Sequence, residues 1–431
     1  MSGYTRRDLL KALGASGVML GGMSGNVIGL DKLIRGDSVS NLGIEMGKSY
    51  GADLIKPGTI IDSGNYMNFP QLKELLPEHQ YLRLKKGATR SDLPPMHIVP
   101  TRKLNFTKTE QAWEEKNKGV VQMDPKTHAL INWKAGRPFP EPKNMYEVTW
   151  NFYLRHLMYG DAEFFRNGTF AVVDSLNRRK DVSFKIWTRM WQGRTTVPPV
   201  PEYSINPDNI YYKQTTVFTK PYDAAGFAVL RHRYFSPDKA DDAWAYVPAI
   251  RRVRRFTGDD LQDPLFGTDV TMDDFGGWIQ KVDFKNVVPT KVEDGLILCY
   301  AYLPKWYDGH SVKIDKNNRQ AYYPSWEIRP VYKLTVEIKN PGYGYGKRVT
   351  WIDKETDMGV YMEFYDQKGR LFRTWLPGYS MEEDGSFAWG YIEAEDWING
   401  SKTHILIQQD HYNATFSDEV FSKEYLRQLG R

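Results

Sequence analysis

Residues 227–256 read FAVLRHRYFSPDKADDAWAYVPAIRRVRRF, and this stretch decides the fold. Its first nine residues are rich in aromatic and β-branched types, and residues 236–242 contain the turn-forming types Ser, Pro and Asp. The chain then returns through residues 244–248 and runs on to Phe256. Apolar runs bounded by Pro and Asp indicate strands, and Pro248 indicates an edge strand or a bulge. The pattern predicts a β-hairpin in the wall of a curved antiparallel sheet.

The composition also favours a β-rich protein. The 431 residues include 27 Tyr, 20 Phe and 13 Trp, and flat side chains pack well on pleated surfaces. The length allows one to three domains. The formal net charge is +5, to which the N-terminal 30 residues contribute Arg6, Arg7 and Lys11 against Asp8. The rest of the chain is nearly balanced in charge, so nucleic-acid binding is not indicated.

The N-terminus has the form of an export signal. Residues 5–11 read TRRDLLK and resemble the twin-arginine signature, with Arg6 and Arg7 as its pair. The stretch that follows to Leu30 is weakly apolar and rich in glycine, which disfavours the alternative of an ordinary amphipathic helix. We therefore expect a periplasmic protein of a Gram-negative cell, exported by the twin-arginine translocase. No clear cleavage site is visible, so release and tethering to the inner membrane both stay open.

Several further elements follow from local patterns. Asn144 and Glu147 have the spacing of a capping box and predict a core-facing helix that runs to about Tyr159. Residues 107–118 predict a polar surface helix, and residues 273–281 predict another helix. Short strands are expected at residues 81–86 and 96–99. The only cysteine, Cys299, lies in the apolar run LILCYAY, which predicts a buried strand and a core thiol.

The clearest sheet region lies near the C-terminus. Residues 348–353, 360–365 and 370–375 predict three strands joined by short turns, a meander. Val360, Met362 and Phe364 alternate with more polar residues, as in a half-buried strand. The glycine-rich GYGYG at residues 342–346 lacks the features of a phosphate loop and predicts a turn between strands.

Two groups of motifs resemble known families. WIDKET at residues 351–356, a strand and then YDQKG at residues 365–369 resemble the hairpin of LolA-like lipoprotein-sorting proteins. AGRPFP at residues 135–140, Trp150-Asn151 and the W-x-Y-x-P-x-x-R-R-V-R-R string from Trp244 resemble a narrower group. That group is the exported bacterial proteins of domain of unknown function family 1329. The resemblance runs in order over roughly residues 55–400.

The resemblance implies a mainly β fold with some α: a strongly curved antiparallel sheet, a LolA/LolB-like open β-barrel, with helices on its concave side. In LolA and LolB the cavity holds the acyl chains of a lipoprotein. Genes of the narrower family often lie near transporters of the resistance-nodulation-division type. Lipoprotein sorting itself is not implied, because this chain is much longer than those carriers. The expected division is a signal at 1–30, a linker or extension at 31–60, the β-rich domain at 61–400 and a C-terminal extension at 401–431.

A curved sheet lined with apolar side chains could hold a lipid-like molecule. The candidate lining residues are the aromatic and aliphatic members of the predicted strands: Phe227, Val229, Trp244, Tyr246, Trp351, Met362 and Phe364. The alternative is that these side chains fill a solid core.

The arginine run that follows Ile250 predicts a second feature of this site. Arg252 and Arg254 would share one face of a strand and could offer guanidinium groups to an anionic head group. The competing interpretation pairs the arginines with the acidic residues just downstream, namely Asp259, Asp260, Asp263, Asp269, Asp273 and Asp274. The same acids fit no EF-hand loop.

Enzyme signatures are missing from the sequence: there is no G-x-S-x-G, no phosphate loop and no H-E-x-x-H, and the eight histidines show no metal-ligand spacing. We therefore expect no catalytic residue, no metal and no cofactor. The leading hypothesis is a carrier for a hydrophobic, lipid-like ligand that acts with an envelope transporter. An exported enzyme or a subunit of a cofactor-containing complex is one alternative, and a structural envelope protein without a ligand is another.

Overall fold

The computed structural model describes residues 54–155, 160–256, 264–274, 278–303, 313–314, 321–322 and 325–429. The predicted signal with Arg6 and Arg7, and the predicted extension up to residue 53, lie outside these described residues. No helix in the described part of the chain is long and apolar enough to cross a membrane.

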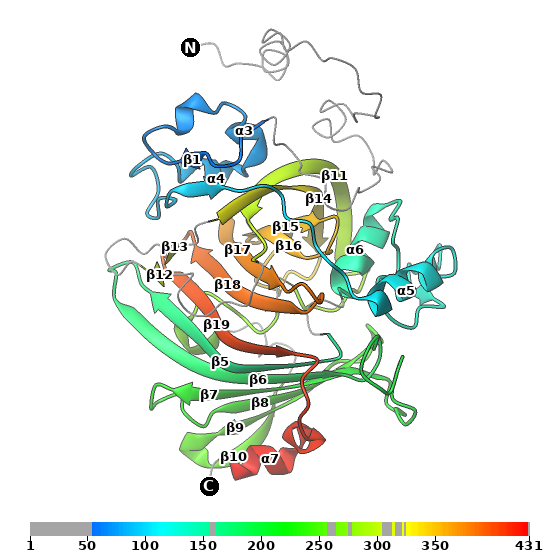
Figure 1. Ribbon diagram of the computed structural model, residues 1–431. Helices are drawn as coiled ribbons and strands as arrows, with labels where there is room; N and C mark the ends of the chain where they lie inside the picture. The colour runs from blue at the N-terminus through cyan, green and yellow to red at the C-terminus, as the bar shows by residue number, and fades with distance from the viewer. Residues whose placement is uncertain are drawn as a thin grey trace.

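One large sheet organises the molecule (Figure 1). Its strands follow the order β1-β2-β14-β15-β16-β17-β18-β19-β5-β6-β7-β8-β9-β10, and β11 pairs with the other edge of β14. Neighbouring strands are antiparallel except for β2 and β14. The fifteen strands are β1 (Ile60–Ile61), β2 (Met96–Ile98), β5 (Ala162–Val173), β6 (Arg179–Met190), β7 (Ile210–Lys220), β8 (Ala228–Tyr234), β9 (Asp242–Val247), β10 (Arg252–Phe256), β11 (Val287–Tyr300), β14 (Ser325–Ile338), β15 (Lys347–Asp353), β16 (Gly359–Tyr365), β17 (Leu371–Met381), β18 (Phe387–Asp396) and β19 (Lys402–Tyr412).

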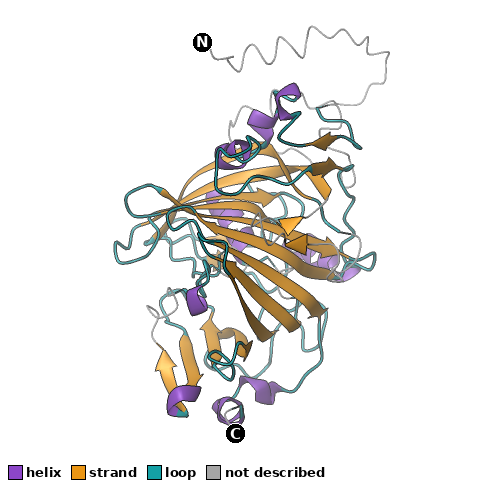
Figure 2. Ribbon diagram, turned by 90° about the vertical axis from the view of Figure 1, so that its left-hand side faces the viewer, coloured by secondary structure: helices purple, strands orange, loops and turns teal. Residues whose placement is uncertain are grey.

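The sheet is strongly curved and does not close into a barrel, as the two views show (Figures 1 and 2). The predicted fold class, a mainly β protein with an open antiparallel sheet and a few helices, is therefore confirmed. Two small hairpins, β3 (Gln122–Met123) with β4 (Leu130–Ile131) and β12 (Lys313–Ile314) with β13 (Ala321–Tyr322), lie outside the large sheet.

The helices are short and lie at the periphery or against one face of the sheet. They are α3 (Leu72–Leu75), α4 (Glu78–Leu82), α5 (Lys108–Asn117), α6 (Met145–Tyr153) and α7 (Lys423–Gln428), with 3₁₀ turns at Tyr66–Asn68, Pro248–Ile250, Leu265–Gly267 and Asp418–Phe421. The predicted surface helix is α5, which begins with a capping box between Thr107 and Glu110. The predicted strand at residues 81–86 is wrong, because these residues end α4 and continue in turns.

Helix α6 begins where the sequence predicts but ends earlier. The Asn144 side chain accepts hydrogen bonds from the backbone N–H groups of Tyr146 and Glu147, as an N-cap does. The helix ends at Tyr153 rather than near Tyr159, and the Arg155 side chain donates to the carbonyl of Phe152. Val148 and Phe152 pack against β11, β14 and Ile352, so the prediction that the helix faces the core is confirmed.

The hairpin of residues 227–256 is confirmed in β8 and β9, where Val229 pairs with Ala245. The expectation that the chain runs straight on to Phe256 is wrong. Pro248 starts a 3₁₀ turn, Arg251 adopts a left-handed backbone with φ 50°, and β10 then turns back to pair with β9. Strand β10 is the edge of the sheet.

The predicted meander is confirmed in β15, β16 and β17, and the predicted turn at residues 342–346 connects β14 to β15. The expected helix at Asp273 to Lys281 is wrong for the described part of that range, which forms turns and loops. Two adjacent glycines, Gly276 and Gly277, lower its helix propensity. The predicted boundary at residue 400 does not separate an extension from the sheet, because β19 lies between β18 and β5.

Candidate functional site

The candidate lining residues fall on two faces of the sheet rather than one. We call the face that carries Phe184, Met362 and Trp375 the inner face, and the opposite face the outer face. Val229, Met362 and Phe364 lie on the inner face, and Phe227 packs against the same core. Trp244, Tyr246 and Trp351 lie on the outer face, in the two clusters that pack against the C-terminal segment and the N-terminal helices.

The two candidate arginines lie at the sheet edge. Arg252 and Arg254 are exposed on β10, and their binding of a head group stays a prediction. The predicted pairing of this arginine run with the downstream acidic residues is wrong for the described residues. Arg255 pairs instead with the upstream Asp242, and Asp269, Asp273 and Asp274 bond to other side chains. Asp259, Asp260 and Asp263 lie outside the described residues.

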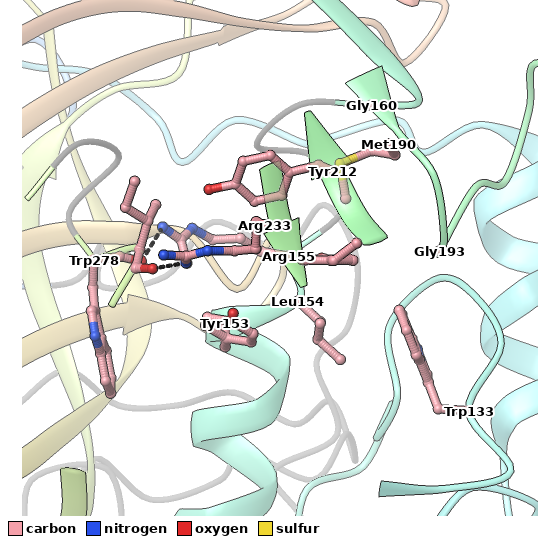
Figure 3. Close-up of a pocket in the computed structure, with 12 residues that line it drawn as sticks. Trp133, Tyr153, Leu154, Arg155, Gly160, Met190, Gly193, Tyr212, Arg233 and Trp278 are labelled. Carbon is pink, nitrogen blue, oxygen red and sulfur yellow. Dashed lines mark hydrogen bonds between the residues drawn. The ribbon is translucent and has the colours of Figure 1, made fainter. Parts of the chain in front are cut away.

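Many side chains of the described residues pack together on the inner face. A cavity there is lined by aromatic residues and two arginines, among them Tyr153, Arg155, Tyr212, Arg233 and Trp278 (Figure 3). The space open to the centre of a water-sized molecule is about 20 Å³, enough for one water. A long acyl chain therefore has no room in this cavity as it stands.

A network of buried charges crosses the inner face. Its cations are Arg231, Arg233, Lys281, Arg348 and Arg373, and its carboxylates are Asp241, Asp273, Asp274 and Asp396. We call these nine residues the inner charge network. Asp241 lies within 3.0 Å of Arg231, Arg233 and Lys281. Burial alone would raise the pKa of Asp241, but these three cations hold it below its ordinary value.

Two tyrosines of the predicted glycine-rich turn connect this network. The hydroxyl of Tyr343 donates to Asp273 at 3.3 Å, and that of Tyr345 donates to Asp274 at 2.7 Å. Arg348 donates in turn to the Tyr343 hydroxyl at 2.8 Å. Burial raises the pKa of both phenols, so they stay neutral donors at ordinary pH. The turn between β14 and β15 is thus held by buried hydrogen bonds.

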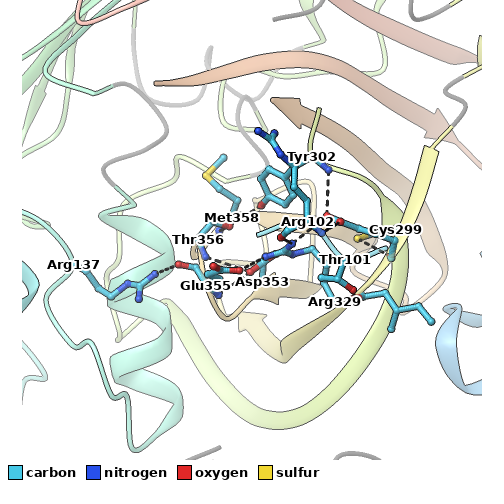
Figure 4. A network of polar contacts seen from close by, with 12 residues as sticks. Thr101, Arg102, Arg137, Cys299, Tyr302, Arg329, Asp353, Glu355, Thr356 and Met358 are labelled. Carbon is cyan, nitrogen blue, oxygen red and sulfur yellow. Dashed lines mark hydrogen bonds and ion pairs between the residues drawn. The ribbon is translucent and has the colours of Figure 1, made fainter. Parts of the chain in front are cut away.

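A second buried network surrounds Arg329 near the turn after β15 (Figure 4). The guanidinium of Arg329 pairs with Glu327 at 3.1 Å, with Glu355 at 2.6 Å and with Asp353. Burial raises the pKa of Glu355 to about 7, against the opposing effect of Arg329. Cys299 is buried beside this network, and burial raises the pKa of its thiol, as a core cysteine requires. The network orders the turn that ends β15.

Next to this network, Arg137 of the AGRPFP motif pairs with Asp357, which lies in the turn after β15. Arg137 Nε lies 2.5 Å from Asp357 Oδ2, and the guanidinium also donates to the backbone carbonyl of Glu355. Burial raises the pKa of Asp357 to about 6 although Arg137 opposes the shift. Two motifs that carry the family resemblance are therefore structural partners, over 200 residues apart in sequence.

A third buried cluster lies on the outer face beneath α4. Arg83 and Lys402 lie 2.8 and 3.1 Å from Glu393. Burial alone would raise the pKa of Glu393, but Arg83 and Lys402 lower it to about 2. Burial lowers the pKa of the neighbouring His404 to about 3, so this histidine is neutral at ordinary pH. Nothing in the local sequence pattern around these residues predicted that they meet.

An open groove lies where β18 and β19 end their pairing. The two strands pair from Tyr391–Leu406 to Glu395–Lys402, and beyond this stretch their ends border a groove of about 560 Å³. Its lining comes from three strands, the turn between β17 and β18, and the segment after β19. It includes Phe164, Arg166, Phe387, Ala388, His411 and Tyr412. The sequence analysis named none of these residues, because the groove depends on which strands become neighbours.

Aromatic packing continues from the groove into the sheet. The Phe164 ring stacks on Trp187 at 4.9 Å and on His411 at 6.1 Å. Phe387 packs at 5.3 Å against Tyr379 on the inner face. Within the described residues, no group of three or more His, Cys, Asp or Glu side chains could hold a metal ion. The lining of the groove thus contains both aromatic and polar side chains.

The described residues thus form an open, curved antiparallel sheet with a groove at its surface. The chain belongs to the family described as Protein of unknown function (DUF1329), whose model matches residues 60–426. This confirms the family resemblance seen in the motifs. A curated relative, Uncharacterized protein PA3922 of Pseudomonas aeruginosa, is 24% identical over 392 residues, which are 84% of this chain and 80% of the relative.

Two of the solved structures to which this chain is similar come from bacteria. One is a putative outer membrane lipoprotein-sorting protein domain from Vibrio parahaemolyticus, and the other a DUF1329 family protein from Desulfovibrio piger. Each has 18% sequence identity and a TM-score of 0.45, and covers 65% of this chain and 97% of its own. A LolA superfamily protein from Nitrosomonas europaea has 14% identity and a TM-score of 0.39, over 64% of this chain and 97% of its own. No ligand of this chain follows from these likenesses.

Proposed function

We propose that this protein binds an amphipathic molecule in the groove between the ends of β18 and β19. The observation that carries the proposal is the size of the groove, about 560 Å³. This volume lies within the roughly 300–1,000 Å³ of typical ligand sites. The cavity on the inner face has room for about one water, so the ligand site expected inside the sheet is better supported at the groove.

The lining of the groove favours a ligand with both an apolar and a polar part. The half-buried Phe164 and Tyr412 supply aromatic surface, and apolar burial contributes about 25 cal/mol per Å². Arg166 and His411 supply polar groups on the same groove. A lipid or a similar amphipathic molecule fits this combination better than a purely hydrocarbon ligand, because the polar groups would otherwise lose water without compensation.

The cellular setting is part of the proposal and rests on the sequence. Arg6 and Arg7 in their export-like context support a periplasmic protein that either leaves the membrane or stays tethered by its signal. Binding and carriage of a ligand, without catalysis and without a cofactor, is the activity we propose. Cooperation with a resistance-nodulation-division type transporter is proposed on the family resemblance alone.

The test is native mass spectrometry of the protein purified from its own envelope, followed by extraction and lipid analysis. Ala414 lines the groove, so Ala414→Trp should fill it, whereas Ala240→Trp places the same side chain in an exposed turn. We expect a bound amphipathic molecule on the wild type and on Ala240→Trp, and its loss from Ala414→Trp. Equal retention by both variants would refute the groove as the site.

The packing of the described side chains on the inner face favours a second candidate, a structural envelope protein that binds no ligand. Aromatic side chains and the inner charge network occupy the space that a carrier would keep open. This candidate predicts a clean apo mass and no uptake of fluorescent lipid analogues by the wild type. The same mass spectrum therefore decides between the two functions.

A further inference from the structure

Four turns at one end of the large sheet each expose a large apolar side chain. The turns join β18 to β19, β5 to β6, β7 to β8 and β9 to β10, and their apolar residues are Ile398, Leu176, Tyr222 and Ile250. The exposed fractions of these side chains are 44, 71, 98 and 42% in that order. A single exposed apolar side chain is ordinary, but one on each of four neighbouring turns needs an explanation.

The strand order brings these four turns together. Strands β18, β19 and β5 to β10 are successive antiparallel neighbours, so the four turns lie at the same end of the strands. Lys180 Nζ, near the start of β6, lies 3.4 Å from Asp223 Oδ2 in the β7–β8 turn. A Cβ at Gly226 in that turn would lie 3.4 Å from Cγ of Pro248 in the β9–β10 turn. The four turns, which we call the apolar rim, thus form a row with roughly 10 Å between neighbours, and the β5–β6 and β7–β8 turns lie on the left in Figure 1.

The turns themselves do not require these apolar side chains. In the β5–β6 turn, the Asp174 carboxylate accepts a hydrogen bond from the backbone N–H of Leu176 at 2.9 Å. In the β18–β19 turn, Asp396 accepts in the same way from the backbone N–H of Ile398 at 2.9 Å. The aspartate shapes each turn, and the apolar side chain takes no part in the bond, so a polar residue would serve the fold equally well. The apolar side chains of the rim are therefore available to a partner.

Exposed basic residues accompany the apolar rim. Arg251 and Arg252 follow directly on Ile250, and Lys220 directly precedes the β7–β8 turn; all three are exposed. The basic residues 178–180 also lie on this rim, each paired with a nearby aspartate. The turn between β17 and β18, at the opposite end of the strands, instead reads EEDGS. These turns differ in the charged residue types that they carry, and the basic residues of the rim suit an anionic partner.

We propose that the apolar rim docks on the surface of an anionic phospholipid bilayer. A bilayer interface accepts apolar side chains that stand apart on separate turns, whereas a protein interface buries a continuous apolar core. Tyr222 has the amphipathic ring that favours the boundary between head groups and acyl chains. The neighbouring arginine and lysine side chains add attraction to anionic head groups. The groove lies at the opposite end of these strands, so the docking surface is distinct from it and does not depend on it.

Fluorescent labels on single cysteines test the contact directly. The only native cysteine, Cys299, is buried, so Leu176→Cys and Tyr222→Cys can each be labelled with an environment-sensitive dye in the whole purified chain. Ile205→Cys is the control, because Ile205 is 83% exposed in the β6–β7 loop at the opposite end of the strands. Vesicles of phosphatidylethanolamine and phosphatidylglycerol should shift the emission of both rim labels to the blue and leave the control label unchanged.

Flotation with the same vesicles measures how much the apolar rim contributes to binding. The combined variant Leu176→Ser, Tyr222→Ser and Ile250→Ser should weaken vesicle affinity by about tenfold or more, and Ile205→Ser should leave it unchanged. All four side chains are exposed, so their loss leaves the packed core intact. The N-terminal segment is present in every variant, so any binding of its own is constant across the comparison.

The two measurements decide the proposal together. Blue shifts of both rim labels on the anionic vesicles but not on neutral phosphatidylcholine vesicles, with weakened affinity of the combined variant, support docking. Equal shifts on both kinds of vesicle overturn the assignment of an anionic surface. Rim labels that do not shift, a control label that shifts equally, or a combined variant with full affinity overturn docking by the rim and point to a protein partner for it instead.

Discussion

Glu355 shows how far this fold departs from a simple apolar core. Its carboxylate lies 2.6 Å from Arg329, yet burial raises its pKa to about 7. Ionising this group inside the protein is thus harder than in the unfolded chain, where its pKa is about 4.5. Such a group links the stability of the protein to pH.

The sign of that linkage follows from the raised pKa. Between about pH 4.5 and 7 the folded state holds a proton on Glu355 that the unfolded state has lost, so its contribution falls as pH rises. We expect Glu355→Gln, which stays neutral, to gain stability relative to the wild type by roughly 2–3 kcal/mol as pH rises through this range. Urea unfolding at several pH values measures the difference.

The matched control is Glu115→Gln on the exposed side of α5. It removes the same charge from the surface and should leave the pH dependence of the wild type unchanged. If Glu355→Gln followed the wild-type pH curve throughout, the burial argument for this carboxylate would be wrong.

Strand β5 contains a glycine that lies in close contact with an aromatic ring of β6. Its pairing with β6 shifts register between Phe165 and Gly168, and Gly168 then lies against the ring of Phe184. A Cβ at this position would overlap that ring, which is itself stacked on Phe170 at 4.4 Å. The glycine is required here by close packing rather than by its backbone angle.

We expect Gly168→Ala to destabilise the protein by about 1–3 kcal/mol, the usual cost of overpacking a core. Gly295→Ala on β11 is the control, because a Cβ there meets nothing within 4 Å. The second variant should be neutral or slightly stabilising. Chemical denaturation compares the two, and equal effects would contradict the packing account.

Local elements of this fold were predictable, and their pairing was not. The start of α6 follows from the Asn144 cap, and the β8–β9 hairpin from its turn residues, because both depend on residues close in sequence. At the end of α6 the Arg155 side chain bonds to the Phe152 carbonyl, and the chain reverses into β10 at Arg251, which has a left-handed backbone. Neither signal is visible in hydrophobic periodicity, so both predictions failed.

At the scale of the whole molecule, the same limit explains why the candidate site could not be predicted from the sequence. Period-two alternation shows that Val229 and Trp244 each face one side of their strand, but only the register shows that the sides are opposite. The groove combines β5, β18 and β19, whose neighbourhood is a property of the completed sheet. The buried charges likewise come from distant segments, such as Arg83 and Glu393.

The central claim is the position of the ligand in the sheet. The most direct measurement is a crystal structure of the protein with a brominated fatty acid, located by the anomalous signal of bromine. The account predicts bromine in the groove beside Phe164 and Tyr412, with an unchanged inner face. Bromine beside Val229, Met362 and Phe364, with the inner side chains displaced, would contradict it and place the ligand within the curve of the sheet.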